Sequence, residues 1–174
     1  MDPLLPSIRT SNNLFKFITF DVDTLLHQPY WSIFEDKTGR QLFWNSYLKS
    51  ALFGHFTWPA PWLAGWLNIN LVLLVLYAVA GSLLSSGGAD RRFTQICIAI
   101  ALFAQLCNRL LIATVVTHDA RMTFPVLVPF IALLGQVTED VWKAYPAFAE
   151  AGFLLLISFA GGGLCFMLQY AGML

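Results

Sequence analysis

Four basic side chains stand where a positive charge could bind an anionic lipid. Arg109 is the single charge in an otherwise apolar run, and a charge inside a membrane helix is costly enough to suggest a function. Its planar guanidinium matches phosphate oxygens, although the long side chain could instead snorkel to the nearby helix end. Arg40, Lys49 and Arg121 are the other candidates for substrate binding. General attraction to lipid head groups is the alternative for the first two, and a loop ion pair is the alternative for Arg121.

The remaining reactive side chains predict no catalytic residue. Asp21 and Asp23 have the spacing of an acidic sugar-transfer motif, but a two-residue match is common by chance, and a solvated face of an extended segment is the favoured interpretation. The three histidines are scattered, so neither a metal nor a cofactor is expected. No Ser-His-Asp spacing, phosphate-binding glycine loop or dinucleotide motif is present in the sequence. The cysteines lie in apolar runs, where they are typical packing residues: Cys97, Cys107 and Cys165.

Apolar runs predict four transmembrane helices that would position these side chains. Hydrophobic residues make up 57% of the 174 residues and charged residues only 11%, against about 25% charged in soluble domains. The third run is short and must extend to about residue 141 to approach the roughly 20 residues of a membrane span. Gly161, Gly162 and Gly163 either allow close helix packing in the fourth run or weaken it. The runs are 66–86, 93–117, 124–137 and 147–172.

Residues 1–65 are more polar than the rest and predict an extramembrane segment in front of a four-helix module of residues 66–174. Alternation over residues 20–24 favours a short extended stretch. Thr38 to Gln41 fits a helix capping box, and the helix that follows is expected to end near Gly54.

The helix after the capping box is predicted to be amphipathic and to lie on the membrane surface. Its apolar face carries Trp44, Leu48, Ala51 and Leu52, and its polar face carries Asn45, Ser46, Lys49 and Ser50. Five of the six tryptophans lie between Trp31 and Trp66, and tryptophan prefers the bilayer interface. The expected fold is therefore an all-α integral membrane protein with four transmembrane helices, preceded by an extramembrane segment with an amphipathic interfacial helix.

The distribution of basic residues predicts a topology. Near the short loops, Arg91, Arg92 and Lys143 stand on one side of the predicted spans, and Arg121 and Lys49 stand on the other. This slight excess favours the first and third loops as cytoplasmic and the N-terminal segment as extracytoplasmic, in a bacterial inner membrane. Ten basic and ten acidic residues cancel, so nucleic acid is not expected as a partner.

Residues 38–54, TGRQLFWNSYLKSALFG, resemble a segment of the GT-C-type integral-membrane glycosyltransferases, such as the protein mannosyltransferases and aminoarabinose transferases. Residues 118–125, HDARMTFP, are similar to an element that precedes a late transmembrane helix in that family. The chain departs from the pattern at His55, where an acidic residue is expected, and at Met122 and Thr123, where an aromatic and an aliphatic residue are expected.

The resemblance implies a polyprenyl-phosphate sugar as the lipid partner. In that family the catalytic acid lies in the first extracytoplasmic loop, to which nothing in this chain corresponds. We therefore expect a glycosyltransferase-derived membrane module without the catalytic half, which could work as one half of a split lipid-linked-sugar transferase. Catalysis by this chain alone is not expected.

A non-catalytic accessory subunit is the alternative. Such a subunit would pack against a larger membrane protein complex and stabilise it, with the tryptophan-rich helix as an anchor. Both interpretations require the bilayer and other membrane protein chains as partners. A transporter or channel has less support, because one intramembrane charge and no polar stripe provide little of a pathway.

Overall fold

The computed structural model describes residues 13–30, 41–53, 60–112 and 126–172. Every element in these ranges is a helix. Three short helices come first, and four long helices follow. The elements are α2 (Leu14–Ile18), α3 (Val22–His27), α4 (Phe43–Phe53), α5 (Pro61–Leu84), α6 (Ala89–Leu111), α7 (Leu127–Ala144) and α8 (Pro146–Tyr170).

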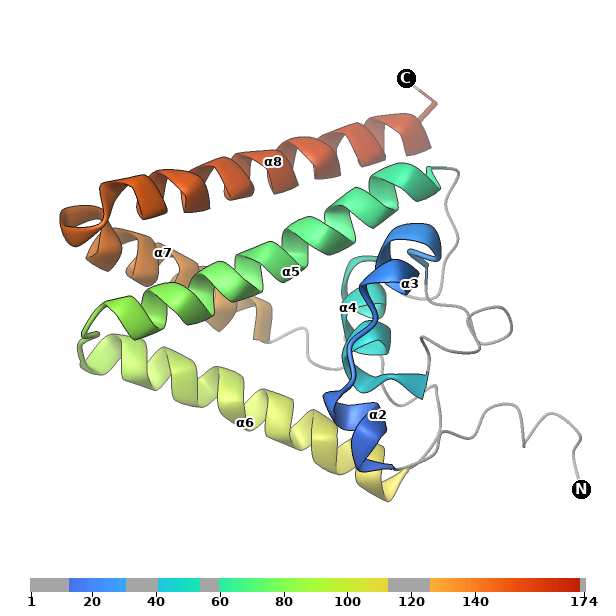
Figure 1. Cartoon of the computed structure of the whole chain (residues 1–174), viewed down its shortest axis with the longest axis horizontal. Coiled ribbons are helices and arrows are strands. Elements are labelled where there is room, and N and C mark those ends of the chain that lie inside the picture. The colour runs from blue at the N-terminus through green and yellow to red at the C-terminus, as the bar shows by residue number, and fades with distance from the viewer. Residues whose placement is uncertain (1–12, 31–40, 54–59, 113–125, 173–174) are drawn as a thin grey trace, which may run out of the picture.

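Helices α5, α6 and α8 run between two ends of the molecule, and α7 runs from the middle of the molecule to one of these ends (Figure 1). The α5–α6 turn and the α7–α8 turn lie together at one end, which we call the hairpin end. The short helices lie at the opposite end, between the first turns of α5 and the last turns of α6 (Figure 1). We call the described residues of this region, 13–30 and 41–53, the cap.

Three of the long helices, α5, α6 and α8, are long and apolar enough to cross a membrane. They contain 24, 23 and 25 residues, and at about 1.5 Å per residue each exceeds the roughly 30 Å hydrocarbon core. The fold therefore fits an all-α integral membrane protein. Helix α7 has 18 residues and carries Glu139, Asp140 and Lys143 near its end. It is not among these three, so the fourth span stays a prediction.

Glycines allow the long helices to approach one another closely. A Cβ atom on Gly152 of α8 would overlap the Tyr77 ring of α5, and a Cβ on Gly81 would overlap the Val137 side chain of α7. In the predicted glycine triplet only Gly162 takes part, where a Cβ would lie 3.1 Å from the Leu67 side chain. The other two glycines of the triplet have open space beside them. The apolar core thus forms where α5 meets α7 and α8.

Residues 22–27 form helix α3, so the predicted extended stretch over residues 20–24 is wrong. Asp21 is the reason, because its carboxylate accepts a hydrogen bond from the Thr24 amide at 3.2 Å and caps the helix. An N-cap of this kind stabilises a helix start that strand-like alternation does not reveal. Thr38, and with it the predicted capping box, lies outside the described residues, whereas α4 ends at Phe53, next to the expected Gly54.

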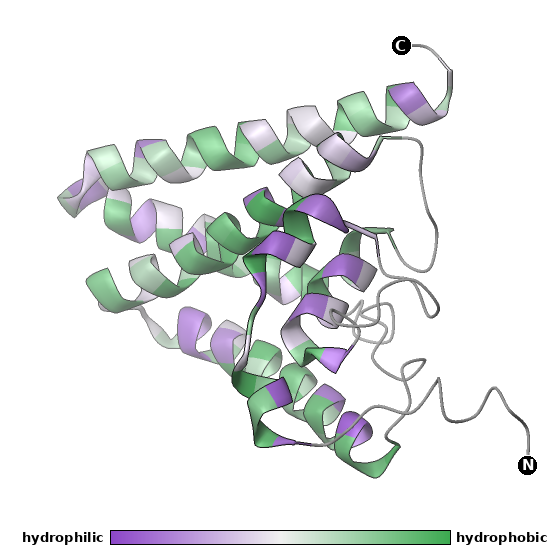
Figure 2. Cartoon of the chain, turned by 45° about the vertical axis from the view of Figure 1, so that its right-hand side comes forward, coloured by the Kyte–Doolittle hydropathy of each residue, from purple (hydrophilic) through white to green (hydrophobic). Residues whose placement is uncertain are grey.

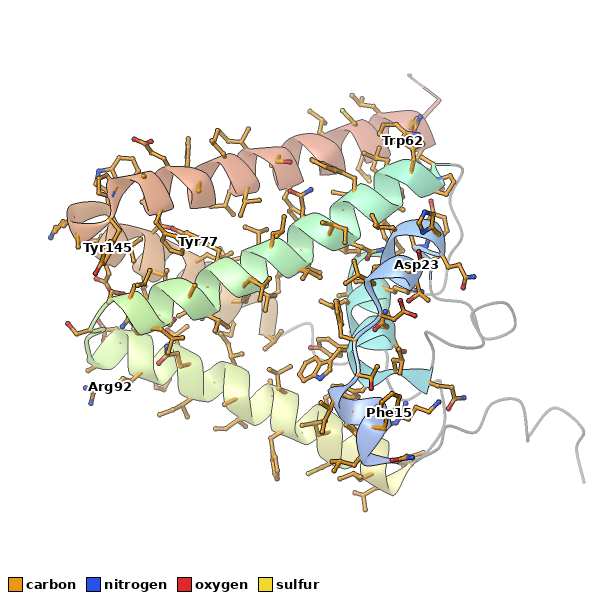
Figure 3. The ribbon with its side chains drawn as sticks, viewed as in Figure 1. Phe15, Asp23, Trp62, Tyr77, Arg92 and Tyr145 are labelled. Carbon is orange, nitrogen blue, oxygen red and sulfur yellow. The ribbon has the colours of Figure 1, made fainter. Side chains whose placement is uncertain are left out.

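Apolar residues cover the outside of the long helices, and polar residues gather at the two ends (Figure 2). Trp62 and Trp66 are exposed near the cap end of α5, and Trp142 and Tyr145 are exposed at the hairpin end. Figure 3 shows Trp62 and Tyr145 at these opposite ends. Aromatic side chains prefer the two membrane–water interfaces, so a bilayer fits between the cap end and the hairpin end.

Candidate functional site

The cap end holds the most deeply buried charges of the described residues. The side chain of Arg109, in the last turns of α6, is completely buried. One guanidinium nitrogen donates to the Gln41 carbonyl at 3.1 Å, and the guanidinium carbon lies 5.6 Å from the centroid of the Phe17 ring. The guanidinium is therefore enclosed by the cap, which differs from the snorkelling alternative, in which it would reach open water.

Lys49 is also completely buried, in α4. The sequence predicts one polar face on this helix, and the four side chains of that face are all buried: Asn45, Ser46, Lys49 and Ser50. The predicted apolar face is the less buried one, with Ala51 exposed and Leu52 half-buried. The polar face of α4 thus meets protein, and the predicted interfacial position of this helix stays a prediction. Its polar face is inside because the neighbouring short helices offer hydrogen-bonding groups to it.

Asn45 supplies most of the hydrogen bonds that turn α4 inward. Its amide oxygen accepts from the Asp21 amide at 2.9 Å. Its amide nitrogen donates to the Asp21 carbonyl at 2.6 Å and to the Thr24 hydroxyl at 2.8 Å. One buried side chain thus fixes the start of α3 against α4. Periodicity did not single out Asn45, because its partners come from a different helix.

The two candidate acidic residues do not form a joint site. The Asp21 carboxylate caps α3, and the Asp23 carboxylate pairs with His27 at 2.8 Å on the exposed side of the same helix. Both carboxylates therefore stabilise the local structure of α3.

Two residues of α5 hold the cap against the transmembrane helices. Asn68 is completely buried and donates to the Pro29 carbonyl at 2.9 Å and to the Leu25 carbonyl at 3.4 Å. At Gly65, a Cβ atom would lie 2.7 Å from the Leu26 carbonyl oxygen, so only glycine allows this approach. The signal for Asn68 in the sequence was one of two amide side chains in an apolar run, since polar side chains in such runs usually mark contacts between elements.

An apolar groove of about 290 Å³ opens between α4, α5 and α8. It begins at Phe53, which follows Lys49 by four residues and so lies on the same face of α4, one turn further on. Gly163 leaves open space in the wall of the groove, because a Cβ atom there would meet nothing within 4 Å. The groove is lined by Leu52, Phe53, Leu67, Phe159, Gly163, Phe166, Met167 and Tyr170.

A second polar cluster, which the sequence did not predict, lies at the hairpin end. Arg91 is nearly buried and pairs with Asp140 at 2.9 Å. The same guanidinium donates to the carbonyl and hydroxyl oxygens of Ser85. This cluster joins the α5–α6 turn to α7, and it stands at the opposite end of α6 from Arg109.

The described part of the chain contains two of the four predicted site residues. Arg109 and Lys49 are both buried at the cap end, whereas Arg40 and Arg121 lie outside the described residues. Within the described ranges, no three His, Cys, Asp or Glu side chains cluster as metal ligands would. All three cysteines are free thiols, two half-buried and one exposed.

The chain was compared with known protein families, curated proteins and solved structures, and none of them matches it.

Proposed function

We propose that this chain is a membrane module of a GT-C-type glycosyltransferase and that it binds the polyprenyl-phosphate part of a lipid-linked sugar. The observation that carries the proposal is the apolar groove between α4, α5 and α8, one turn of α4 beyond the buried Lys49. A polyprenyl phosphate combines a long apolar chain with an anionic head, so it requires an apolar surface beside a cation. The sequence string that carries the family resemblance contains both Lys49 and Phe53.

The expected position of the groove, near the membrane surface, agrees with a lipid phosphate as the ligand. Trp66 is exposed one residue before Leu67, which lines the groove, and exposed tryptophan is typical of the membrane interface. A lipid phosphate also resides at the interface, with its chain directed into the hydrocarbon core. In this arrangement the prenyl chain lies along α8, and the phosphate lies at the interface, near Trp66.

The proposed role is binding rather than chemistry. In the described residues, Asp21 and Asp23 are engaged in the local structure of α3. The acid that catalyses sugar transfer would come from another part of the enzyme or from a partner chain. The described residues would hold the lipid donor.

Binding of undecaprenyl phosphate to the purified full chain in mild detergent, measured by native mass spectrometry, tests the proposal. Gly163→Leu places a side chain in the groove without displacing a neighbour, and we expect binding to weaken about tenfold, corresponding to roughly 1.4 kcal/mol. Gly161→Leu is the matched control, because it enters open space outside the groove. Equal binding by both variants and the unaltered chain would overturn the proposal.

An accessory subunit is the second candidate, and the exposure of α8 favours it. Within an apolar stretch of 18 residues of this helix, only 11% is buried inside the chain. The rest leaves a long surface for another membrane protein. Recovery of the chain in fixed stoichiometry with a membrane complex, without binding of undecaprenyl phosphate, would favour this second function over the first.

A further inference from the structure

We propose that α2 lies in the bilayer interface and inserts an apolar face among the lipids. The three side chains on this face are Leu14, Phe15 and Ile18, which are 72%, 63% and 70% exposed. Their spacing of one and four residues places them on one side of a helix. The inference concerns the membrane contact of the cap and does not depend on the proposed sugar-lipid function.

One residue of α2, Phe17, is fixed to the protein, so the exposed residues have a defined direction. The Phe17 ring lies 5.9 Å from the Phe43 ring of α4. Its other neighbour is the guanidinium of Arg109, 5.6 Å from the ring centroid. Because Phe17 is held from two elements, α2 cannot rotate its exposed residues inward without losing both contacts.

The position of Arg109 along α6 gives the depth of α2. Between the basic residues Arg92 and Arg109, α6 contains about 16 uncharged residues, which span about 24 Å along a helix. The hydrocarbon core is about 30 Å thick, so with Arg92 at one boundary Arg109 lies within about 6 Å of the other. Phe17 contacts this guanidinium, and α2 therefore lies at the same boundary.

The exposed face of α2 continues the lipid-facing surface of α6. Leu110 and Leu111 of α6 are 57% and 83% exposed, and Figures 1 and 2 both show α2 beside the last turns of this helix. Figure 3 shows Phe15 near the end of α6 as well. A bilayer that surrounds α6 thus meets α2 as well, which makes lipid the occupant. The proposal adds α2 as an interfacial element of the cap, and the predicted interfacial position of α4 is a separate prediction.

A fluorescent label tests this contact. In a full-length chain whose three cysteines are replaced by alanine, a single cysteine is placed at Phe15 or, as control, at Asp23, whose side chain is 80% exposed. Each variant is labelled with nitrobenzoxadiazole and reconstituted in phosphatidylcholine–phosphatidylglycerol nanodiscs. Both positions are exposed, so the label displaces no core residue. A label at Leu14 repeats the measurement at a second site.

We expect lipids that carry a doxyl group at carbon 5 to quench the label at position 15 at least threefold more than the label at position 23. Aqueous iodide is expected to show the reverse preference. Equal iodide quenching at positions 15 and 23 would mean that α2 faces water. Protection of position 15 from both quenchers would mean that protein covers it, either a second copy or another chain. Either result overturns the proposal.

Discussion

The guanidinium carbon of Arg109 lies 5.6 Å from the centre of the Phe17 ring, although the two residues are far apart in the sequence. This contact joins the end of a membrane-spanning helix to the first helix of the cap. A buried cation over an aromatic face is attracted by the ring quadrupole, with up to about 2 kcal/mol where water is excluded. The pair thus fixes where the cap lies along α6.

Replacing Arg109 by leucine is expected to loosen the cap. The variant loses the ring contact with Phe17 and the hydrogen bond to the Gln41 carbonyl, and we expect a destabilisation of about 2 kcal/mol. Thermal unfolding in detergent measures the change, and limited proteolysis reports on the cap. Arg109→Lys keeps the charge and should recover part of the stability. A cap as resistant to protease as that of the unaltered chain would contradict the anchoring role.

Asn45→Ala is expected to cost about 2–3 kcal/mol in the free energy of unfolding. The substitution leaves the amide and carbonyl of Asp21 without the side chain that binds them, and unsatisfied buried groups are expensive. Asn13→Ala is the matched control, because Asn13 caps α2 at the surface and its loss should cost about 1 kcal/mol or less. Equal costs for the two variants, measured by denaturant titration, would argue against the buried network.

A side chain at Gly152 is expected to disrupt the contact between α5 and α8. The Tyr77 ring that it would meet is stacked on Phe148 at 4.8 Å and hydrogen-bonded to Thr138 at 2.9 Å, so the ring cannot easily move away. We expect Gly152→Val to lower stability by about 2 kcal/mol or more.

The control for that variant is Gly161→Ala, which enters open space. Alanine is the better helix former, so this change should be neutral or stabilising by up to about 1 kcal/mol. Tryptophan fluorescence during thermal unfolding compares the two chains. If Gly152→Val unfolds at the same temperature as the control, the helices do not cross at this position.

Arg91→Met is expected to destabilise the hairpin end by about 1–2 kcal/mol. The change removes both hydrogen bonds to Ser85 and the ion pair with Asp140. Because the Asp140 side chain is 40% exposed, water can solvate its charge after the substitution, so the ion pair adds little to the cost. Arg92→Met, at the exposed neighbouring position, should change stability by less than about 0.5 kcal/mol. A double-mutant cycle with Asp140→Asn should show coupling between positions 91 and 140, and additive effects would exclude the pair.

Composition and apolar runs were sufficient to predict helical membrane spans, because the bilayer requires long stretches without charge. The first span also shows the limit of this argument. Helix α5 begins at Pro61, before the predicted start at Trp66, because interfacial residues such as Trp62 continue the helix without adding to an uninterrupted apolar run. Whether α7 crosses the membrane depends on how its terminal charges are paired, which a hydrophobicity count does not capture.

The candidate site was less predictable, because its polar residues face protein rather than solvent. Periodicity correctly placed Asn45 and Lys49 on one face of α4, but it could not tell which face points inward. That depends on hydrogen-bond partners more than 20 residues away, such as Asp21. The groove was equally hidden, because its lining comes from three helices that only tertiary packing brings together.

The anchoring of the cap has a consequence for how the protein is made. The described residues of the cap leave the ribosome before the residues that hold them in place, which are Gly65 and Asn68 in α5 and Arg109 in α6. The cap therefore cannot settle until both of these helices have been inserted and have come together in the bilayer. During that interval the polar face of α4 must stay in water or be shielded by the cell's insertion machinery.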